Sequence, residues 1–200
     1  MLHYSPDGVS AVSLASREHV RWIKLGSPAH MDRIGLRSAE CSARGALSDT
    51  FDAEAILVPV PRNKPRKAGA LWPAMRIAED LLRHGLGRDV RPLLERRAPI
   101  EKSALRRVGS KRPTPEDHIR TIRVVDALQV SARRIVLVDD VVTRGATLLG
   151  CASLLVRLLS GIEIRAFAAV RTMSGLEVDG MLAPVTGVIT YANGRLHREP

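Results

Sequence analysis

Two adjacent acids and a threonine-rich turn stand close together in the second half of the chain. Asp139 and Asp140 directly follow the apolar residues 135–138, and Thr143-Arg144-Gly145-Ala146-Thr147 begins two residues later. A continuous apolar run of this kind is typical of a strand that is buried on both faces of a parallel sheet. We therefore expect the strand to end at the acids, on the carboxyl edge of the sheet, where ligands bind in open α/β folds.

The residue types in this stretch suit a sugar phosphate. A turn that contains glycine and opens an apolar helix leaves backbone N–H groups unpaired at the positive end of the helix dipole, which suits a phosphate group. Thr143 and Thr147 add hydroxyl groups at the same point. Two carboxylates can accept hydrogen bonds from ribose hydroxyls or help to hold a hydrated cation. Two solvated acids before an ordinary strand-to-helix turn are the alternative, but the order of the features favours a ribose 5-phosphate site.

The order of residues 136–147 (apolar strand, two acids, two apolar residues, Thr-x-Gly-x-Thr) resembles the phosphoribosyl-pyrophosphate (PRPP) motif of type I phosphoribosyltransferases, most closely in the competence-protein-F-like group. The resemblance implies an α/β, type I phosphoribosyltransferase fold with a mainly parallel central sheet flanked by helices and a small hood from terminal segments. It also implies a glycosyltransferase (a pentosyltransferase) that transfers the ribosyl 5-phosphate of PRPP to a nitrogen nucleophile and releases pyrophosphate, with Mg²⁺ bridging the phosphates.

In this resemblance, Asp139 and Asp140 hold the ribose hydroxyls, and the 5-phosphate lies on Thr143, Arg144, Gly145, Ala146 and Thr147. Direct protein ligands of the Mg²⁺ ion are not assigned. Arg144 stands where the family commonly has a second threonine, so a hydroxyl is lost there while the backbone N–H remains.

A basic loop follows an earlier apolar segment. Residues 53–60 read as a buried strand, and Pro61, Arg62, Asn63 and Lys64 come next, in a loop that proline stiffens. If the sheet is parallel, this loop shares an edge with Asp139, where it would suit a second anion such as pyrophosphate. It resembles the pyrophosphate loop of phosphoribosyltransferases. A solvated basic loop is the alternative.

A strongly basic segment covers residues 91–123, with ten basic residues against four acids. Prolines and a glycine interrupt any periodicity, so we expect a long loop over much of residues 95–120. The resemblance implies a mobile loop that closes over PRPP, with Lys102, Arg106, Arg107 and Lys111 covering the leaving group. A nucleic-acid patch is the alternative, and because the segment contains no aromatic residue, it could contact only the nucleic-acid backbone.

Composition limits the other possibilities. Two hundred residues suit a single domain, with the resemblance covering about 54–170 and segments 1–50 and 171–200 serving as hood or extensions. The net charge of +10 favours anionic partners, either phosphorylated substrates or non-specifically bound nucleic acid, unless it only reflects a generally basic composition. Cys41 and Cys151 form no metal or disulfide framework, which favours a reducing cytoplasm, with Cys151 buried. The sequence shows neither a signal peptide nor a membrane span.

The remaining elements are predicted from periodicity and punctuation. We expect short strands or a hairpin within 9–23, a helix starting at Ser27-Pro28, a helix starting at Leu71-Trp72-Pro73 and a strand over 89–94. Further along, we expect a helix capped by Thr114 and continuing through Val125, a strand over 163–171 and a hairpin over 187–198. His118 is expected on a helix surface. Lys24, in a Lys-x-Gly segment like that of the resembled group, is a candidate for the site, with a solvated lysine favoured.

Three questions stay open at this stage. The nitrogen acceptor, expected to be nucleobase-like, is not identified. The chain could be an enzyme, or a PRPP- or nucleotide-sensing protein, or a competence-related nucleic-acid-associated protein on the same fold, because a fold alone does not determine function. A homo-oligomer is compatible with the sequence.

Overall fold

The computed structural model describes residues 2–100, 112–126, 131–173, 177–178, 180 and 184–199. A central sheet of five strands, all parallel, has the order β1-β7-β6-β2-β3. Its strands are β1 (Leu2–Tyr4), β2 (Ile56–Pro59), β3 (Asp89–Val90), β6 (Arg134–Val142) and β7 (Glu163–Thr172). The expected α/β class and the parallel central sheet are therefore confirmed.

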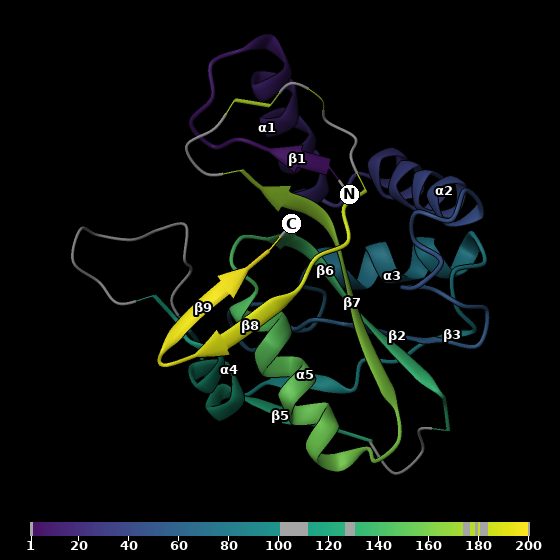
Figure 1. Cartoon of the computed structure of the whole chain (residues 1–200), viewed down its shortest axis with the longest axis vertical. Helices are drawn as coiled ribbons and strands as arrows, with labels where there is room; N and C mark the ends of the chain where they lie inside the picture. The colour runs from purple at the N-terminus through teal and green to yellow at the C-terminus, as the bar shows by residue number, and fades with distance from the viewer. Residues whose placement is uncertain are drawn as a thin grey trace.

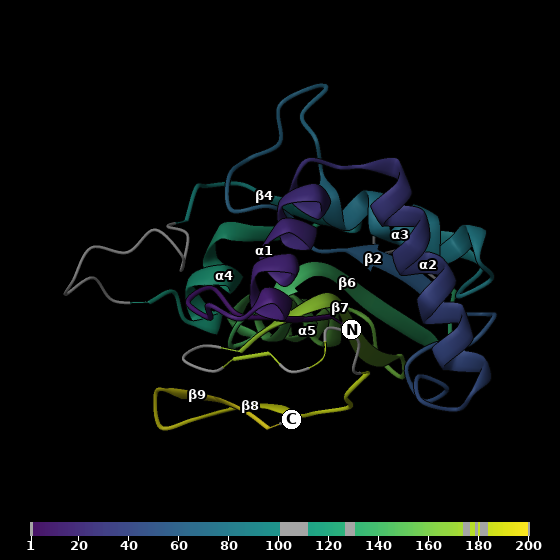
Figure 2. The same ribbon diagram turned by 90° about the horizontal axis from the view of Figure 1, so that it is seen from above.

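Helices cover both faces of this sheet. They are α1 (Ala11–Lys24), α2 (Pro28–Ala43), α3 (Pro73–Arg83), α4 (Pro115–Thr121) and α5 (Ala146–Leu158). Helices α1, α2 and α3 lie on one face and α5 lies on the other, as Figures 1 and 2 show from two directions. Two antiparallel pairs complete the fold: β4 (Leu94–Arg96) with β5 (Ile122–Val124), and β8 (Ile189–Ala192) with β9 (Arg195–Arg198).

The middle of the sheet is the core, as the apolar run predicted. The side chains of β6 from Ile135 to Val138 are fully buried because β2 and β7 pair on either side and helices cover both faces. Val136 and Val138 pack with residues of α1, α2 and α3, whereas Ile135 and Leu137 pack with residues of α5. Because successive side chains of β6 point to opposite faces of the sheet, the strand contributes to two apolar layers, one on each face.

The N-terminal segment differs from the expectation. Residues 11–24 form helix α1 and not short strands. Ser10 caps the helix by accepting a hydrogen bond from the backbone N–H of Ser13 at 3.2 Å. The buried stripe consists of Ser13, Ser16 and Ile23, so two of its three residues are polar. This composition concealed the helical period, which is read from apolar residues.

Two elements in the rest of the chain also differ from the expectation. The expected strand over 89–94 is two short strands, β3 and β4, which belong to different sheets. Helix α4 ends at Thr121 and does not continue through Val125, because the next residues pair with β4 as β5. The capping box of Thr114 and Asp117 confirms the predicted start of α4. The helices expected to begin at Pro28 and Pro73, and the strand expected within 163–171, are confirmed.

Both terminal regions contribute to the structure around the sheet. β1 pairs with β7 at the edge of the central sheet. The predicted C-terminal hairpin is confirmed, with Asn193 and Gly194 at φ 52° and 72° in its turn. In Figure 1 this hairpin crosses in front of the region where α5 begins.

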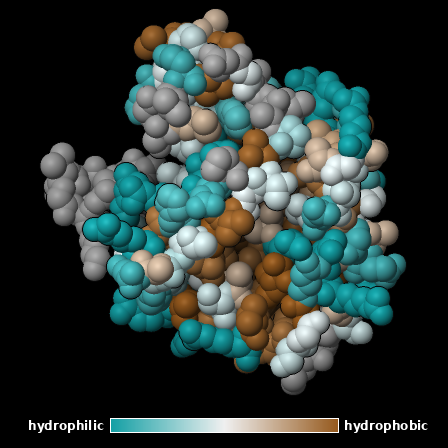
Figure 3. Space-filling model, in the orientation of Figure 1, coloured by the Kyte–Doolittle hydropathy of each residue, from teal (hydrophilic) through white to brown (hydrophobic). Residues whose placement is uncertain are grey.

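The outer surface of α5 carries apolar side chains. Val156 and Leu158 are each 60% exposed, and Figure 3 shows apolar side chains gathering on the face of the molecule that carries α5. In the described parts of the chain, every helix is too short or too polar to cross a membrane. A homo-oligomer remains a prediction.

Candidate functional site

The two acids lie inside β6 and not after its end. The strand continues to Val142, with Asp139 paired to Ala168 and Val142 paired to Arg171 of β7. The sequence expectation that the strand stops at the acids was wrong because β7 extends far enough to hold two further residues in the ladder. Both acids are nevertheless near the carboxyl end of the strand, and both are partly buried.

Lys24 reaches Asp140 from the last turn of α1. Its Nζ lies 2.5 Å from Oδ2 of Asp140, whose side chain is 15% exposed, while that of Lys24 is 52% exposed. The expected solvated lysine is therefore half-exposed but also paired, and α1 brings a cation to the acid pair. Burial raises the pKa of Asp139 well above its ordinary value, and the charge of Asp140 raises it further, while the charge of Lys24 acts in the opposite direction. The pair therefore favours a single negative charge.

The threonine-rich turn leads directly into α5. Gly145 is the N-terminal cap at φ 91°, a left-handed conformation that suits glycine. No side chain caps this helix, so the cap leaves the N–H groups of its first turn without a side-chain acceptor and available to a ligand. Arg144 is exposed. The hydroxyl of Thr143 lies 3.4 Å from that of Thr172 at the end of β7.

The C-terminal hairpin rests on this turn. A Cβ atom at Gly145 would lie 2.3 Å from Cδ1 of Ile189, so glycine is required there both by conformation and by close packing. Arg198 donates hydrogen bonds to the carbonyl oxygens of Val142 and Thr172, at 3.3 Å and 3.2 Å. Residues from the two ends of the chain thus surround the acids and the turn, with Lys24 on one side and Ile189 on the other.

The basic loop leaves the sheet beside the acids, as predicted. The backbone N–H of Val60 donates to the carbonyl of Val138 at 2.9 Å, immediately before Asp139. Pro61 is buried, Asn63 is half-buried, and Arg62 and Lys64 are exposed. Because β2 and β6 are parallel neighbours, the loop and the acids share one edge of the sheet.

Two contacts fix the course of this loop. Arg62 donates a hydrogen bond to the carbonyl of Leu71 at 2.6 Å. The backbone N–H of Ile100 donates to the carbonyl of Asn63 at 2.8 Å, and the Asn63 side chain donates to the carbonyl of Ile100 at 3.3 Å. The predicted covering loop follows Ile100 in the sequence. Its named residues, Lys102, Arg106, Arg107 and Lys111, lie outside the described residues.

A buried arginine joins the basic loop to α4. Arg96 of β4 is 3% exposed and donates to the carbonyl of Arg62 at 2.9 Å and to the hydroxyl of Thr121 at 2.5 Å. Its third contact is Nδ1 of His118, at 3.2 Å. Because arginine can only donate, Nδ1 of a neutral His118 accepts, and the ring proton is on Nε2.

This tautomer determines which hydrogen bond His118 makes with Thr147, the last residue of the threonine-rich turn. Nε2 of His118 lies 3.3 Å from Oγ1 of Thr147, so the imidazole donates to the threonine oxygen. The hydroxyl hydrogen of Thr147 then remains free to donate to a ligand. Burial, followed by the charge of Arg96, lowers the pKa of His118 to about 4, which keeps the ring neutral near pH 7.

The expectation of His118 on the surface was wrong, and Gly150 of α5 provides the reason. A Cβ at Gly150 would lie 2.7 Å from Cβ of His118 and 2.9 Å from the carbonyl oxygen of Pro115. The missing side chain lets α4 approach α5 closely enough to bury the imidazole. Sequence reasoning also missed Arg96, because an arginine between Glu95 and Arg97 in a short charged segment normally indicates solvent exposure.

The remaining sequence expectations for this region concern Cys151 and metal ligands. Cys151 is buried, as predicted, and burial raises the pKa of its thiol. Within the described ranges, no three His, Cys, Asp or Glu side chains are grouped as a metal site. The carboxylates of Asp139 and Asp140 could contribute to holding a cation here, because carboxylate oxygens are ligands that Mg²⁺ accepts.

No known protein-family model matches the chain, and no curated protein matches it either.

Proposed function

We propose that the chain is a phosphoribosyltransferase of the type I fold, which binds PRPP with Mg²⁺ and transfers the ribosyl 5-phosphate to a nitrogen nucleophile. One observation carries the proposal: two acids, an uncapped helix N-terminus and a basic loop meet at the carboxyl edge of the neighbouring parallel strands β2 and β6. Ligands of open α/β sheets bind at this edge. The three features match, in order, the ribose, the 5-phosphate and the pyrophosphate of PRPP.

Each group of residues has a separate role in this proposal. Asp139 and Asp140 accept hydrogen bonds from the ribose hydroxyls. The backbone N–H groups at the start of α5 and the hydroxyl of Thr147 donate to the 5-phosphate. The exposed side chains of Arg62 and Lys64 attract the pyrophosphate, and the rate enhancement comes from stabilising the negative charge of this leaving group.

A Mg²⁺ ion fits this arrangement as a partner of the substrate. With few protein oxygens at the edge of the sheet, the phosphates of PRPP would supply much of its coordination, and Asp139 and Asp140 would contribute directly or through water. When bound, the ion neutralises the charge that develops on the departing pyrophosphate.

The direct test of the proposal is PRPP binding by the double variant Asp139→Asn, Asp140→Asn. Calorimetry with Mg²⁺ should give binding for the wild type and weaker binding for the variant. A charge-assisted hydrogen bond is worth about 1.5–3 kcal/mol, so the loss of one should weaken binding by roughly tenfold or more. Asparagine preserves the shape of each side chain, so the fold should survive.

Asp49→Asn is the matched control, because Asp49 is exposed and lies outside the site. It removes one carboxylate of the same kind and should leave PRPP affinity unchanged. Equal affinity for PRPP in the wild type and the double variant would refute the assignment of the acids.

A PRPP- or nucleotide-sensing protein on the same fold is the second candidate, and two contacts favour it. Asp140 is already paired with Lys24, and Ile189 packs against Gly145 of the turn. A sensor could couple the release of these contacts to ligand binding. Pyrophosphate release from PRPP with a panel of nucleobases separates the candidates: turnover supports the enzyme, and tight binding without turnover by any base supports the sensor.

A further inference from the structure

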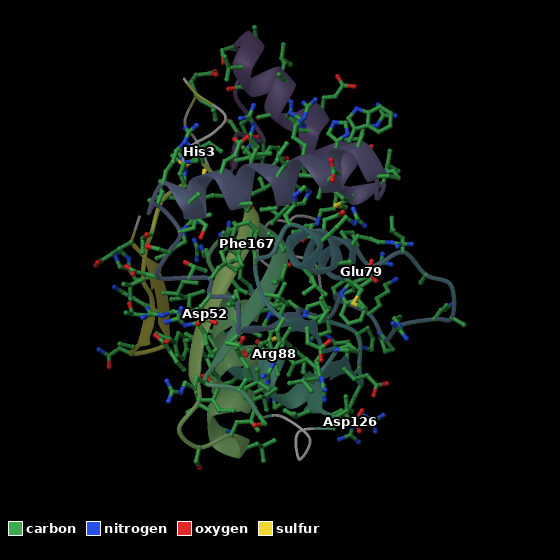
Figure 4. The ribbon with its side chains drawn as sticks, turned by 90° about the vertical axis from the view of Figure 1, so that its right-hand side faces the viewer. His3, Asp52, Glu79, Arg88, Asp126 and Phe167 are labelled. Atoms are coloured by element: carbon green, nitrogen blue, oxygen red, sulfur yellow. The ribbon has the colours of Figure 1, made fainter. Side chains whose placement is uncertain are left out.

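A pocket lies on the face of the central sheet that α1, α2 and α3 cover, away from the threonine-rich turn. Helices α1 and α2 enclose this pocket of about 210 Å³ above β1 and β7. Its floor consists of apolar residues, including Ile23, Phe167 and Ala169, which are each at most 3% exposed. Figure 4 shows Phe167 on β7 beneath the helical layer. An apolar cavity of roughly 150 Å³ can hold benzene, so this pocket has room for one ring with a small substituent.

The rim of the pocket is basic. His19 of α1 and His30, Arg33 and Arg37 of α2 surround the apolar floor. Their partners only partly offset this charge. Arg37 pairs with Glu40 at 2.7 Å, and Nδ1 of His30 contacts the hydroxyl of Ser27 at 2.9 Å.

Arg33 lacks such a partner, since no ion pair or hydrogen bond of its guanidinium is found within the described ranges. Burial lowers the pKa of His19, and the charges of His30 and Arg33 lower it further, while Glu18 opposes them. The lowered pKa keeps the His19 ring neutral near pH 7, so the charge at the mouth of this apolar pocket comes from Arg33 and Arg37. An anion at this mouth would pair with Arg33 and accept hydrogen bonds from the imidazole rings.

We propose that this pocket binds a small organic carboxylate, with an apolar body such as one aromatic ring on the floor and the carboxylate at Arg33 and the two histidines. The size and the apolar floor select the body, and the unpaired charge of Arg33 selects the anion. This site is separate from the proposed PRPP site. It nevertheless adjoins that site, because Ile23 of the floor precedes Lys24, whose amine contacts Asp140.

Benzoate is a suitable probe, with benzyl alcohol as a neutral compound of similar shape. Trp22 provides a signal, because its ring stacks on His30 with a centroid distance of 5.7 Å and is 39% exposed. Benzoate should change the fluorescence of the full chain in a saturable way and bind at least tenfold more tightly than benzyl alcohol. Trp22→Phe should remove the signal while calorimetric binding persists.

Two variants test the two halves of the pocket. Arg33→Gln should weaken benzoate binding about tenfold and leave benzyl alcohol binding unchanged. Ala169→Leu should abolish binding of both compounds by filling the floor. Arg21→Gln is the matched control, because it removes the same charge from α1. Arg21 is exposed and does not line the pocket.

Thermal unfolding establishes whether each variant is folded. Arg33→Gln changes only the rim, so it keeps the proposal testable if Ala169→Leu does not fold. Equal affinities for benzoate and benzyl alcohol, or benzoate affinity unchanged by Arg33→Gln, would overturn the proposal.

Discussion

At the scale of single residues, the acid pair depends on a cation from a distant part of the chain. Lys24 and Asp140 are 116 positions apart in the sequence, yet their side chains are in contact. The apolar run and the two acids predicted carboxylates at the carboxyl edge of the sheet, but no local pattern indicates which amine reaches them. The protonation of Asp139 is therefore set by tertiary structure, through burial, Asp140 and Lys24.

Lys24→Met tests this coupling. Because Lys24 lowers the pKa of Asp139 against the effects of burial and Asp140, its removal should raise that pKa further. Carboxyl-carbon chemical shifts followed across a pH titration would measure the change. Lys67→Met is the control, since Lys67 is exposed on the basic loop. A pKa of Asp139 that is equal in the wild type and Lys24→Met would contradict the coupling.

His118 makes a separate prediction about stability and pH. Its pKa is about 4 in the folded protein against an ordinary 6.5, so between these values the unfolded chain binds the extra proton. Stability should therefore be complete above pH 6.5 and fall progressively as the pH drops toward 4. At 1.36 kcal/mol per pKa unit, the loss is roughly 3 kcal/mol.

Urea unfolding at a series of pH values would measure this loss. Between pH 6.5 and 4, His118→Gln should remove the part of the pH dependence of the unfolding free energy that His118 contributes. This holds whatever effect the substitution has on stability at pH 7. His197→Gln, at an exposed position of β9, should keep the slope of the wild type. A parallel pH dependence in the wild type and His118→Gln would show that the imidazole is not held neutral by burial.

At the scale of elements, the contact between α4 and α5 positions the threonine-rich turn. α4 carries His118 and α5 begins at the turn. At Gly150 of α5 the two helices are so close that a Cβ atom would meet His118 and the carbonyl oxygen of Pro115. In an open helix, alanine would stabilise relative to glycine by roughly 0.5–1 kcal/mol. Here the packing effect should exceed the helix-propensity effect.

Gly150→Ala should destabilise the protein by about 1–3 kcal/mol, the usual cost of overpacking. It should also weaken PRPP binding, because α4 must move and take His118 away from Thr147. Denaturant unfolding and calorimetry would measure the two effects. Val156→Ala in the same helix is the control, because Val156 is 60% exposed, and a change within about 0.5 kcal/mol is expected there. A Gly150→Ala protein that is more stable than the wild type would exclude the close approach.

The sequence predicted the elements whose patterns are local. The apolar residues of β6, the proline starts of α2 and α3, the capping box at Thr114 and the Asn193-Gly194 turn each identified an element correctly. Helix α1 was mistaken for strands because serines occupy its buried stripe. Its correct assignment depends on tertiary packing, which propensity alone does not report.

In the candidate site too, only the residues that belong to a local sequence pattern were predicted. The acids, the turn and the basic loop were found because each follows or lies within a recognisable strand, and the parallel sheet brings them to one edge. Arg96 and His118 were not found, because their importance comes from burial between β4, α4 and α5. A charged or polar residue is buried by contacts between distant segments, and such contacts leave no periodic signal.

At the scale of the whole molecule, the net charge of +10 should make the protein bind polyanions. The basic loop contributes Arg62, Lys64, Arg66 and Lys67, all of them exposed. The nearby Trp72 cannot serve as a platform for bases, since it is only 9% exposed and the Arg66 guanidinium lies 5.5 Å from its ring centre. Binding to single-stranded nucleic acid should therefore be electrostatic and insensitive to base sequence.

The salt dependence of oligonucleotide binding gives the quantitative prediction. The log–log slope against salt is about −0.7 for each phosphate contacted on a single strand, so neutralising Lys64 and Lys67 together by glutamine should make the slope shallower by roughly 1.4. The double control Arg44→Gln, Arg157→Gln removes two exposed charges elsewhere and should change the slope less.

PRPP with Mg²⁺ should compete with the oligonucleotide, because both require the charges of the basic loop. Fluorescence anisotropy across a salt series measures all three effects, and sequence-selective binding that neither salt nor PRPP weakens would locate nucleic-acid recognition on a different surface.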